Sequence, residues 1–284
     1  MKKHLLTLFA VLFIQISMFA QNPGIQDSVI RILAIGNSFS EDGVETYLHE
    51  LADAGNKKII IGNMYIGGAP LSLHLENSKN GAANYSYRKI GLDGIKKTKE
   101  KISLAQALTD EPWDYISFQQ VSSLSGKYEV IMQSLPDLTV YVRKKVGTKP
   151  QFIYHQTWAY QHDSKHEGFA IYDKNQRTMY RAIAKTTKRL KKEFDFAFIV
   201  PAGTAIQNGR TSSIGDNFTR DGYHLQLDYG RFTAACAWYE KLFNLDVRQN
   251  SYIPTNVNSE QATIAKAAAH NAIKRPFKIS KIKL

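Results

Sequence analysis

The sequence predicts an α/β fold: a three-layer α/β/α sandwich built on a five-stranded parallel sheet. Three observations support this prediction. Five short apolar runs have the composition of strands that are buried on both faces of a sheet. Amphipathic helical segments separate the runs, and this alternation is typical of parallel sheets covered by helices on both sides. Polar or glycine-rich residues follow every run, at the edge where parallel α/β proteins bind ligands.

The predicted strands are short and end abruptly at turn residues. In chain order they occupy residues 29–35, 58–64, 113–118, 151–154 and 196–200. Residues 77–101 have no regular period and contain several Asn, Gly and Tyr residues. We therefore expect a short hairpin or an insertion over one edge of the sheet in that segment.

The predicted helices carry apolar residues at helical spacing. Segment 41–54, for example, places Val44, Leu48 and Leu51 on one face. In chain order the helices are expected over residues 41–54, 71–76, 104–108, 128–146, 172–194, 227–243 and 260–274. Residues 207–224 are predicted to form a polar loop.

The N-terminal segment has the pattern of a targeting signal. Two lysines precede an apolar run over residues 5–19, and Ala20 provides a small residue at a cleavage point, so residues 1–20 are predicted to be a secretory signal peptide. A membrane anchor is disfavoured because the run is short and contains Gln15. Residues 21–284 are then expected to form a single domain in the periplasm or outside the cell, with no membrane insertion after cleavage.

Composition and charge exclude several classes of site and partner. The formal net charge of +12 favours acidic partners. The lysines are dispersed over predicted helix faces, however, and no nucleic-acid-binding motif appears, so we expect surface charge and no nucleic-acid partner. Cys236 is the single cysteine and lies in an apolar helical pattern, where a buried structural role is expected. Because the histidines are scattered, we expect no metal and no cofactor.

Ser38 is the candidate nucleophile. It follows the first predicted strand directly, in Gly36-Asn37-Ser38. Gly36 lets the backbone turn sharply and present the hydroxyl. A serine nucleophile needs a neighbouring base. Taken alone, Ser38 could equally be a helix-capping residue, a role for which Ser40 competes.

His224 is the candidate base, and Asp221 lies three residues before it across a glycine. A tight turn there could place the Asp221 carboxylate on one imidazole nitrogen and leave the other nitrogen free to take a proton from a serine. Taken alone, an Asp-x-x-His pattern is more often a loop-capping motif.

Four blocks in this order resemble the SGNH (GDSL-type) hydrolase superfamily, which has a flavodoxin-like α/β/α fold. The blocks are Gly-Asn-Ser-Phe-Ser after the first strand, Gly-Gly after the second, a polar cluster after the third and Asp-Gly-Tyr-His before the last helices. The resemblance spans residues 32–243. It implies that Ser38, Asp221 and His224 form a catalytic triad. The sequence Phe-Gln-Gln-Val-Ser in the third block is similar to an uncharacterised secreted branch in Bacteroidetes.

The resemblance also implies an oxyanion hole. A backbone amide of Gly67 or Gly68 is expected to serve as one donor. The asparagine donor that is usual in the third block is replaced by Gln119-Gln120, and because glutamine carries the same amide, Gln119 is expected to complete the hole. The usual Gly-Asp-Ser is Gly-Asn-Ser, a change at a non-catalytic position from which we expect little consequence.

Further residues at strand ends are expected to bind the substrate: Asn37, Gln120, His155 and Trp158. For His155 and Trp158, burial in the core is the alternative interpretation. The sequence thus predicts a serine esterase whose substrate is a small-molecule or glycan ester, first an O-acetylated carbohydrate and second a lipid or aryl ester. The alternative function is a non-catalytic glycan- or polyanion-binding protein on the same scaffold.

Overall fold

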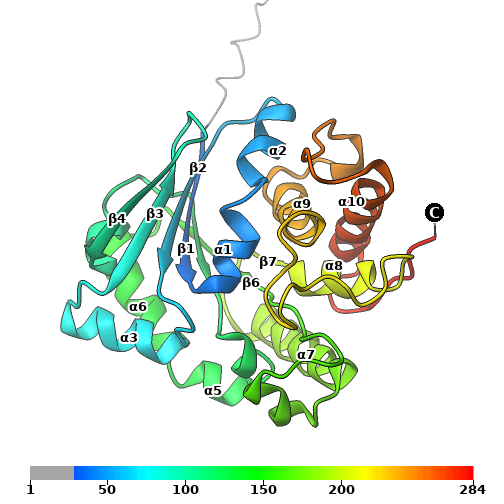
Figure 1. Ribbon diagram of the computed structural model, residues 1–284. Coiled ribbons are helices and arrows are strands. Elements are labelled where there is room, and N and C mark those ends of the chain that lie inside the picture. Colours follow the sequence, from blue (N-terminus) through cyan, green and yellow to red (C-terminus); the bar gives the residue numbers. More distant parts are fainter. Residues whose placement is uncertain (1–28, 284) are drawn as a thin grey trace, which may run out of the picture.

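The computed structural model describes residues 29–283, so the predicted signal peptide lies outside the described residues and stays a prediction. A seven-stranded sheet with the order β4-β3-β2-β1-β5-β6-β7 runs through the centre of the molecule (Figure 1). The strands are β1 (Ile30–Gly36), β2 (Ile59–Tyr65), β3 (Tyr85–Ile90), β4 (Lys96–Ile102), β5 (Tyr115–Phe118), β6 (Gln151–His155) and β7 (Phe198–Val200).

The five predicted strands are the five parallel strands of this sheet. β1 pairs with β2 and β5, and β6 pairs with β5 and β7, all in parallel. The carboxyl ends of β1, β2 and β5 therefore meet at one edge, as the sequence predicted. The α/β/α fold class is confirmed.

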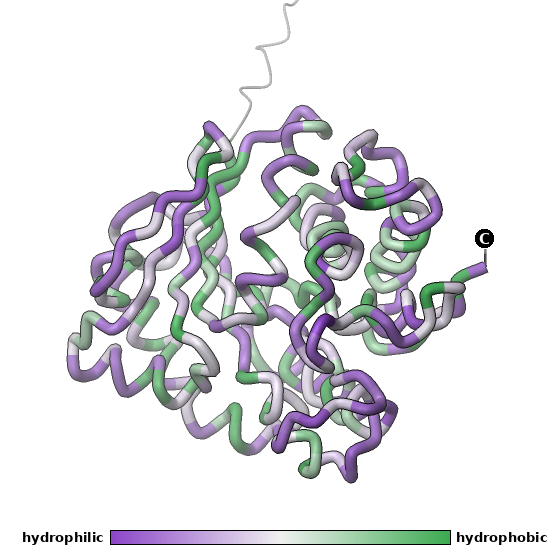
Figure 2. Tube along the Cα trace, in the orientation of Figure 1, coloured by the Kyte–Doolittle hydropathy of each residue, from purple (hydrophilic) through white to green (hydrophobic). Residues whose placement is uncertain are grey.

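The count of five strands was wrong, because the hairpin β3–β4 extends the sheet. β3 is antiparallel to β2, and β4 is antiparallel to β3. Hydropathy could not reveal β4, since its sequence Lys-Lys-Thr-Lys-Glu-Lys-Ile is exposed over nearly its whole length. Figure 2 shows hydrophilic residues along this outer edge and apolar residues in the central strands.

Helices cover both faces of the sheet (Figure 1). One face packs against α2, α9 and α10, and the other against α3, α4 and α6. The helices are α1 (Ser38–Val44), α2 (Leu48–Ala54), α3 (Leu71–Asn80), α4 (Leu104–Leu108), α5 (Tyr128–Met132), α6 (Leu135–Val146), α7 (Gln176–Glu193), α8 (Ala202–Gly209), α9 (Tyr229–Phe243) and α10 (Ser259–Lys274), with short 3₁₀ helices η1 (Ser122–Leu124), η2 (Glu167–Tyr172) and η3 (Val247–Gln249).

Two of the predicted long helices are each divided in two. The segment predicted as 41–54 forms α1 and α2, with Tyr47 in the left-handed region (φ 69°) just before α2 begins. The segment predicted as 128–146 forms α5 and α6, and Pro136 in the first turn of α6 cannot continue a preceding helix.

A third difference from the prediction is α8. The sequence predicted no helix there, because Ala-Gly-Thr-Ala-Ile-Gln-Asn-Gly has weak helix propensity. Every residue of α8 is buried, so tertiary packing stabilises the helix. Cys236 is fully buried in α9, as expected, and burial raises the pKa of its thiol. Within residues 29–283, no helix is long and apolar enough to cross a membrane.

Two fully buried histidines make the stability of the fold depend on pH. Burial lowers the pKa of His74 to about 4 and that of His155 to about 3. In the unfolded chain a histidine has a pKa of about 6.5. Between these values the unfolded state binds protons that the folded state does not. The free energy of unfolding should therefore fall as the pH falls below about 6.5, by about 1.4 kcal/mol per pH unit for each histidine.

Urea unfolding of the wild type and of His74→Asn between pH 7.5 and 4.5 measures this effect. The variant should lose stability with falling pH less steeply than the wild type, by about 1.4 kcal/mol per pH unit. His49→Asn, at a partly exposed position on α2, is the matched control and should leave the slope unchanged. Equal slopes in wild type and His74→Asn would contradict the prediction.

Candidate active site

Ser38 lies where β1 turns into α1. Gly36 ends the strand, Asn37 is the N-cap of the helix, and Ser38 is its first residue. The Asn37 Oδ1 accepts a hydrogen bond from the backbone N–H of Phe39 at 3.0 Å, which fixes this turn. The Ser38 Oγ lies 2.9 Å from the Nε2 of His224.

Asp221 and His224 lie in a closed turn between α8 and α9, which we call the histidine loop (residues 219–226). The Asp221 Oδ2 lies 2.6 Å from the His224 Nδ1. Gly222 has a φ of 91°, a conformation that glycine adopts readily. This turn lets the Asp221 Oδ1 accept hydrogen bonds from the backbone N–H groups of Tyr223 and His224. The structure thus brings together all three residues of the predicted triad.

The protonation of Asp221 follows from these contacts. Partial burial raises its pKa, but the hydrogen bonds from the His224 side chain and from the two backbone N–H groups outweigh burial, so the pKa lies below its usual range. Asp221 is therefore a carboxylate at neutral pH. A carboxylate on Nδ1 fixes the proton there and leaves Nε2 as the acceptor that faces the Ser38 hydroxyl.

Gly67 and Gly68 lie beside Ser38 in the loop after β2, which we call the glycine loop (residues 66–70). Both line a cavity of about 230 Å³ together with Ser38 and His224. Within the described part of the chain, the backbone N–H groups of Ser38, Gly67 and Gly68 have no hydrogen-bond partner. These amides are therefore available to an oxygen atom bound in the cavity.

Asn37 lines this cavity and connects the Ser38 turn to the glycine loop. It is 1% exposed. Its Oδ1 accepts hydrogen bonds from Phe39 and from the Nε2 of Gln119, and its Nδ2 donates to the carbonyl oxygen of Ala69 at 2.9 Å. An aspartate could not donate to Ala69. The Asn in Gly-Asn-Ser therefore has a structural role, contrary to the expectation of little consequence. Asn37 also lines the cavity of Ser38, and its predicted contact with a substrate stays a prediction.

Gln119 was expected in the oxyanion hole, and the structure places it elsewhere. It is 2% exposed and does not line the cavity of Ser38. Its Nε2 donates to Asn37 at 2.7 Å, and its Oε1 accepts from the Nδ1 of His155 at 3.0 Å. Gln119 thus holds the Asn37 side chain in place. Chain order placed this residue at the correct strand end but could not reveal the partner that occupies its amide.

Three predicted substrate contacts were wrong, since the side chains are buried. The Gln120 Oε1 accepts hydrogen bonds from the backbone of Leu71 and Val121. His155 is fully buried under Gln119. Trp158 stacks on Phe39 with ring centroids 4.3 Å apart, and its indole N–H donates to the carbonyl oxygen of Tyr223, where it supports the histidine loop.

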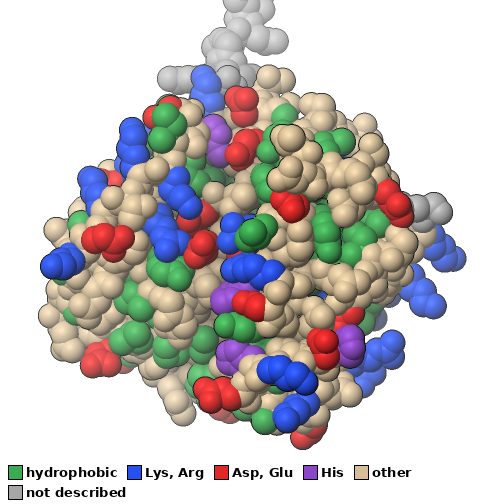
Figure 3. Space-filling view, viewed as in Figure 1, with side chains coloured by type: hydrophobic (Ala, Val, Ile, Leu, Met, Phe, Trp, Pro, Cys, Tyr) green, Lys and Arg blue, Asp and Glu red, His purple; other side chains and the backbone are tan. Residues whose placement is uncertain are grey.

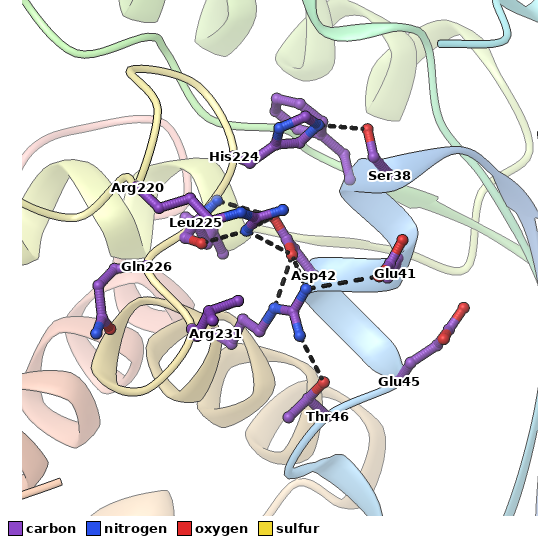
Figure 4. A network of polar contacts seen from close by, with 12 residues as sticks. Ser38, Glu41, Asp42, Glu45, Thr46, Arg220, His224, Leu225, Gln226 and Arg231 are labelled. Atoms are coloured by element: carbon purple, nitrogen blue, oxygen red, sulfur yellow. Dashed lines mark hydrogen bonds and ion pairs between the residues drawn. The ribbon is translucent and has the colours of Figure 1, made fainter. Parts of the chain in front are cut away.

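Asp42 was not predicted, and it fixes the histidine loop to the helix of Ser38. Its carboxylate is fully buried, one helical turn after Ser38. The Oδ2 accepts from the backbone N–H of Leu225 at 2.8 Å, and the Oδ1 accepts from Arg231 at 2.7 Å and from Arg220 at 3.2 Å. Figure 4 shows both arginines converging on Asp42, next to the contact between His224 and Ser38. An aspartate in a helix is usually exposed, so the sequence carries no signal for this role.

His166 also reaches the cavity of Ser38, and sequence reasoning missed it because residues 160–171 have no regular period. Its Nδ1 accepts a hydrogen bond from the backbone N–H of Gly168 at 3.0 Å. The other side chains on the cavity wall include Tyr65, Val121, Ser122 and Tyr223.

Within residues 29–283, one group of residues that could hold a metal ion lies outside the Ser38 cavity. It consists of Glu240, Asp246 and His270. Chain spacing did not reveal it, since the members are distant in sequence. Their atoms are already engaged, as His270 contacts Glu240 at 2.8 Å and Arg248 pairs with Asp246 at 2.6 Å. The cluster is therefore interpreted as an ion-pair network.

Removing the Asp42 carboxylate should destabilise the protein. Asp42→Ala leaves Arg220 and Arg231 without their shared partner, and breaking a buried pair in this way costs about 3–5 kcal/mol. The exposed pair of Asp137 with Lys79 provides the control, because Asp137→Ala should cost less than about 1 kcal/mol. Urea unfolding at pH 7 measures both variants. Similar losses in the two variants would show that the buried network contributes no more than a surface ion pair.

The chain was compared with known proteins. A family model described as "Domain of unknown function (DUF4886)" matches residues 31–272. A DUF4886 family protein from Bacteroides uniformis, solved as a crystal structure, is 47% identical with a TM-score of 0.88, and the match covers 90% of this chain and 98% of that one. No curated protein matches the chain.

More distant solved structures agree with the predicted resemblance. A candidate SGNH hydrolase from Slackia heliotrinireducens is 21% identical with a TM-score of 0.52, and the match covers 76% of this chain and 100% of that one. At this identity the match shows the fold alone. An acetyl xylan esterase from Geobacillus stearothermophilus is 12% identical over 80% of this chain and 97% of that one, with a TM-score of 0.48, too low to carry an argument. The chain has the fold of the SGNH hydrolases and belongs to the DUF4886 family.

Proposed function

We propose that this protein is a serine esterase in which Ser38, His224 and Asp221 act as a catalytic triad. The observation that carries the proposal is the continuous hydrogen-bond chain from the Ser38 Oγ to the His224 Nε2 (2.9 Å) and from the His224 Nδ1 to the Asp221 Oδ2 (2.6 Å). A nucleophile, a base and a group that orients the base in this geometry define a recurring catalytic constellation. The proposed activity needs no metal and no cofactor.

The reaction follows from the positions of these atoms. The His224 Nε2 takes the proton of the Ser38 hydroxyl as the Ser38 Oγ attacks the ester carbonyl. The Asp221 carboxylate stabilises the imidazolium that forms. The unpartnered amides of Ser38, Gly67 and Gly68 are the proposed donors to the oxyanion. His224 then returns the proton to the leaving alcohol, and the acyl-enzyme is hydrolysed by a water molecule that His224 deprotonates.

An O-acetyl ester of a carbohydrate is the proposed substrate. The cavity beside Ser38 is only about 230 Å³, which supports a short acyl group. Polar side chains such as Ser122 and His166 on its wall support a hydroxylated alcohol. The predicted signal peptide supports a periplasmic or secreted enzyme that meets such substrates outside the cytoplasm.

Purified residues 21–284 should hydrolyse p-nitrophenyl acetate, and Ser38→Ala and His224→Ala should abolish turnover, with losses of up to about 10⁶-fold. Asp221→Asn, which favours the wrong imidazole tautomer, should lower kcat by about 10⁴-fold. Ser213→Ala is the control and should keep full activity, because Ser213 is exposed and does not line the Ser38 cavity. Equal background release by the wild type and the triad variants would contradict the proposal and favour a non-catalytic glycan- or polyanion-binding protein.

Asn37→Asp tests the link between Asn37 and the oxyanion site. The substitution replaces the donor to the Ala69 carbonyl oxygen by a carboxylate oxygen that repels it, so the glycine loop should shift away from Ser38. Loss of a single oxyanion donor costs about 10²–10³-fold in kcat, and a displaced loop should cost up to about 10²-fold with little change in KM. The matched control is Asn84→Asp, at an exposed asparagine. An unchanged kcat in Asn37→Asp would show that the glycine loop keeps its place without this contact.

A further inference from the structure

We propose that a second cavity beside the Ser38 cavity is the subsite for a polyhydroxylated alcohol, the sugar part of the ester, and that His166 binds this alcohol where the two cavities meet. The inference rests on the proposed function and specifies its substrate. We call the second cavity the alcohol subsite; its wall is formed by residues 162–167, Ala170 and Lys174.

The two cavities are adjacent because they share a wall residue. His166 lines both the cavity of Ser38, about 230 Å³, and the alcohol subsite, about 400 Å³. An alcohol that reaches from Ser38 to His166 therefore also borders the larger space.

The chemistry at Ser38 determines which part of an ester points toward His166. The base must return its proton to the leaving oxygen, so the alcohol part lies next to His224 and the oxyanion lies toward the glycine loop. The Tyr223 ring contacts His224 with ring centroids 4.1 Å apart, and the His166 ring contacts Tyr223 with centroids 4.7 Å apart. His166 thus lies on the side of the base, which is the side of the alcohol.

His166 offers a hydrogen-bond donor there. Since its Nδ1 accepts from the Gly168 N–H, a neutral His166 carries its proton on Nε2. Burial is the main cause that lowers the pKa of His166; the charges of Glu167 and Asp221 raise it and that of His224 lowers it, and burial outweighs the carboxylates. The ring is therefore neutral at pH 7. No residue in 29–283 accepts a hydrogen bond from this Nε2–H. The donor is free to bind a substrate hydroxyl.

The alcohol subsite has mixed charge, which fits hydroxyl groups better than an anion. Lys165 and Lys174 are balanced by Asp163 and Glu167 on the same wall. A hydroxyl both donates and accepts, so it can use ammonium and carboxylate groups alike. Figure 3 shows histidine, basic and acidic side chains gathered together in the lower part of the visible face. The neighbouring His162 ring is held in place by Asp216 at 2.7 Å.

Two acetate esters that differ only in their alcohol test the inference: p-nitrophenyl acetate and a mono-O-acetylated methyl xylopyranoside. His166→Asn keeps a short acceptor for the Gly168 N–H and removes the donor at Nε2. The ratio of kcat/KM for the sugar ester to that for the aryl ester should fall about tenfold, mainly through a higher KM for the sugar ester. Lys165→Ala, at an exposed position, should lower the same ratio about threefold. His49→Asn is the control and should leave the ratio unchanged.

The outcomes separate this inference from the proposed function. An unchanged ratio in His166→Asn, or a wild type that cleaves the aryl ester but not the sugar ester, would overturn the alcohol subsite and leave the esterase in place. A wild type that cleaves neither ester would overturn the esterase. In that case calorimetric titration with the acetylated xyloside decides the subsite: binding that His166→Asn weakens supports it, and absence of binding overturns it.

Discussion

The buried carboxylate of Asp42 joins two segments that lie far apart in the chain. Ser38 and Asp42 belong to one short helix, while Leu225 and Arg231 follow more than 180 residues later, with sequence separations of 183 and 189 from Asp42. Asp42 binds the backbone of Leu225, the residue directly after His224. Asp42 therefore fixes the segment that carries the base to the helix that carries the nucleophile. Two arginines neutralise this buried carboxylate, and the backbone N–H of Leu225 adds a further hydrogen bond.

A second set of buried hydrogen bonds supports the site from the side of the sheet. His155 donates to Gln119, Gln119 donates to Asn37, and Asn37 donates to Ala69 in the glycine loop. The side-chain amides of Gln119 and Asn37 each donate one of these hydrogen bonds and accept another. Such a network specifies one arrangement strongly when it is satisfied and is costly when one member is lost. The positions of the free amides beside Ser38 thus depend in part on His155 and Gln119, which do not line the cavity.

The sequence predicted the parts of this protein that have local patterns. Parallel strands could be predicted from apolar runs, and Asp221 and His224 from their spacing across Gly222. Gln120, His155 and Trp158 were predicted to face the substrate because they follow strands, and Gln119 was expected in the oxyanion hole from the family resemblance. Which side chain faces the cavity depends on distant partners, however. Asp42 and His166 left no signal for the same reason: their contacts are made with segments that only the folded chain brings near.

The lysine-rich strand β4 affects whether two copies of this protein can pair through their sheet edges. As an edge strand it exposes unpaired backbone groups that could pair with the same strand of another copy. Lys96, Lys97, Lys99 and Lys101 lie along it, and Figure 3 shows basic side chains over this edge. An antiparallel copy would bring lysines opposite lysines, and like charges directly opposite are destabilising. The lysines of β4 thus disfavour pairing of this edge with the same edge of another copy.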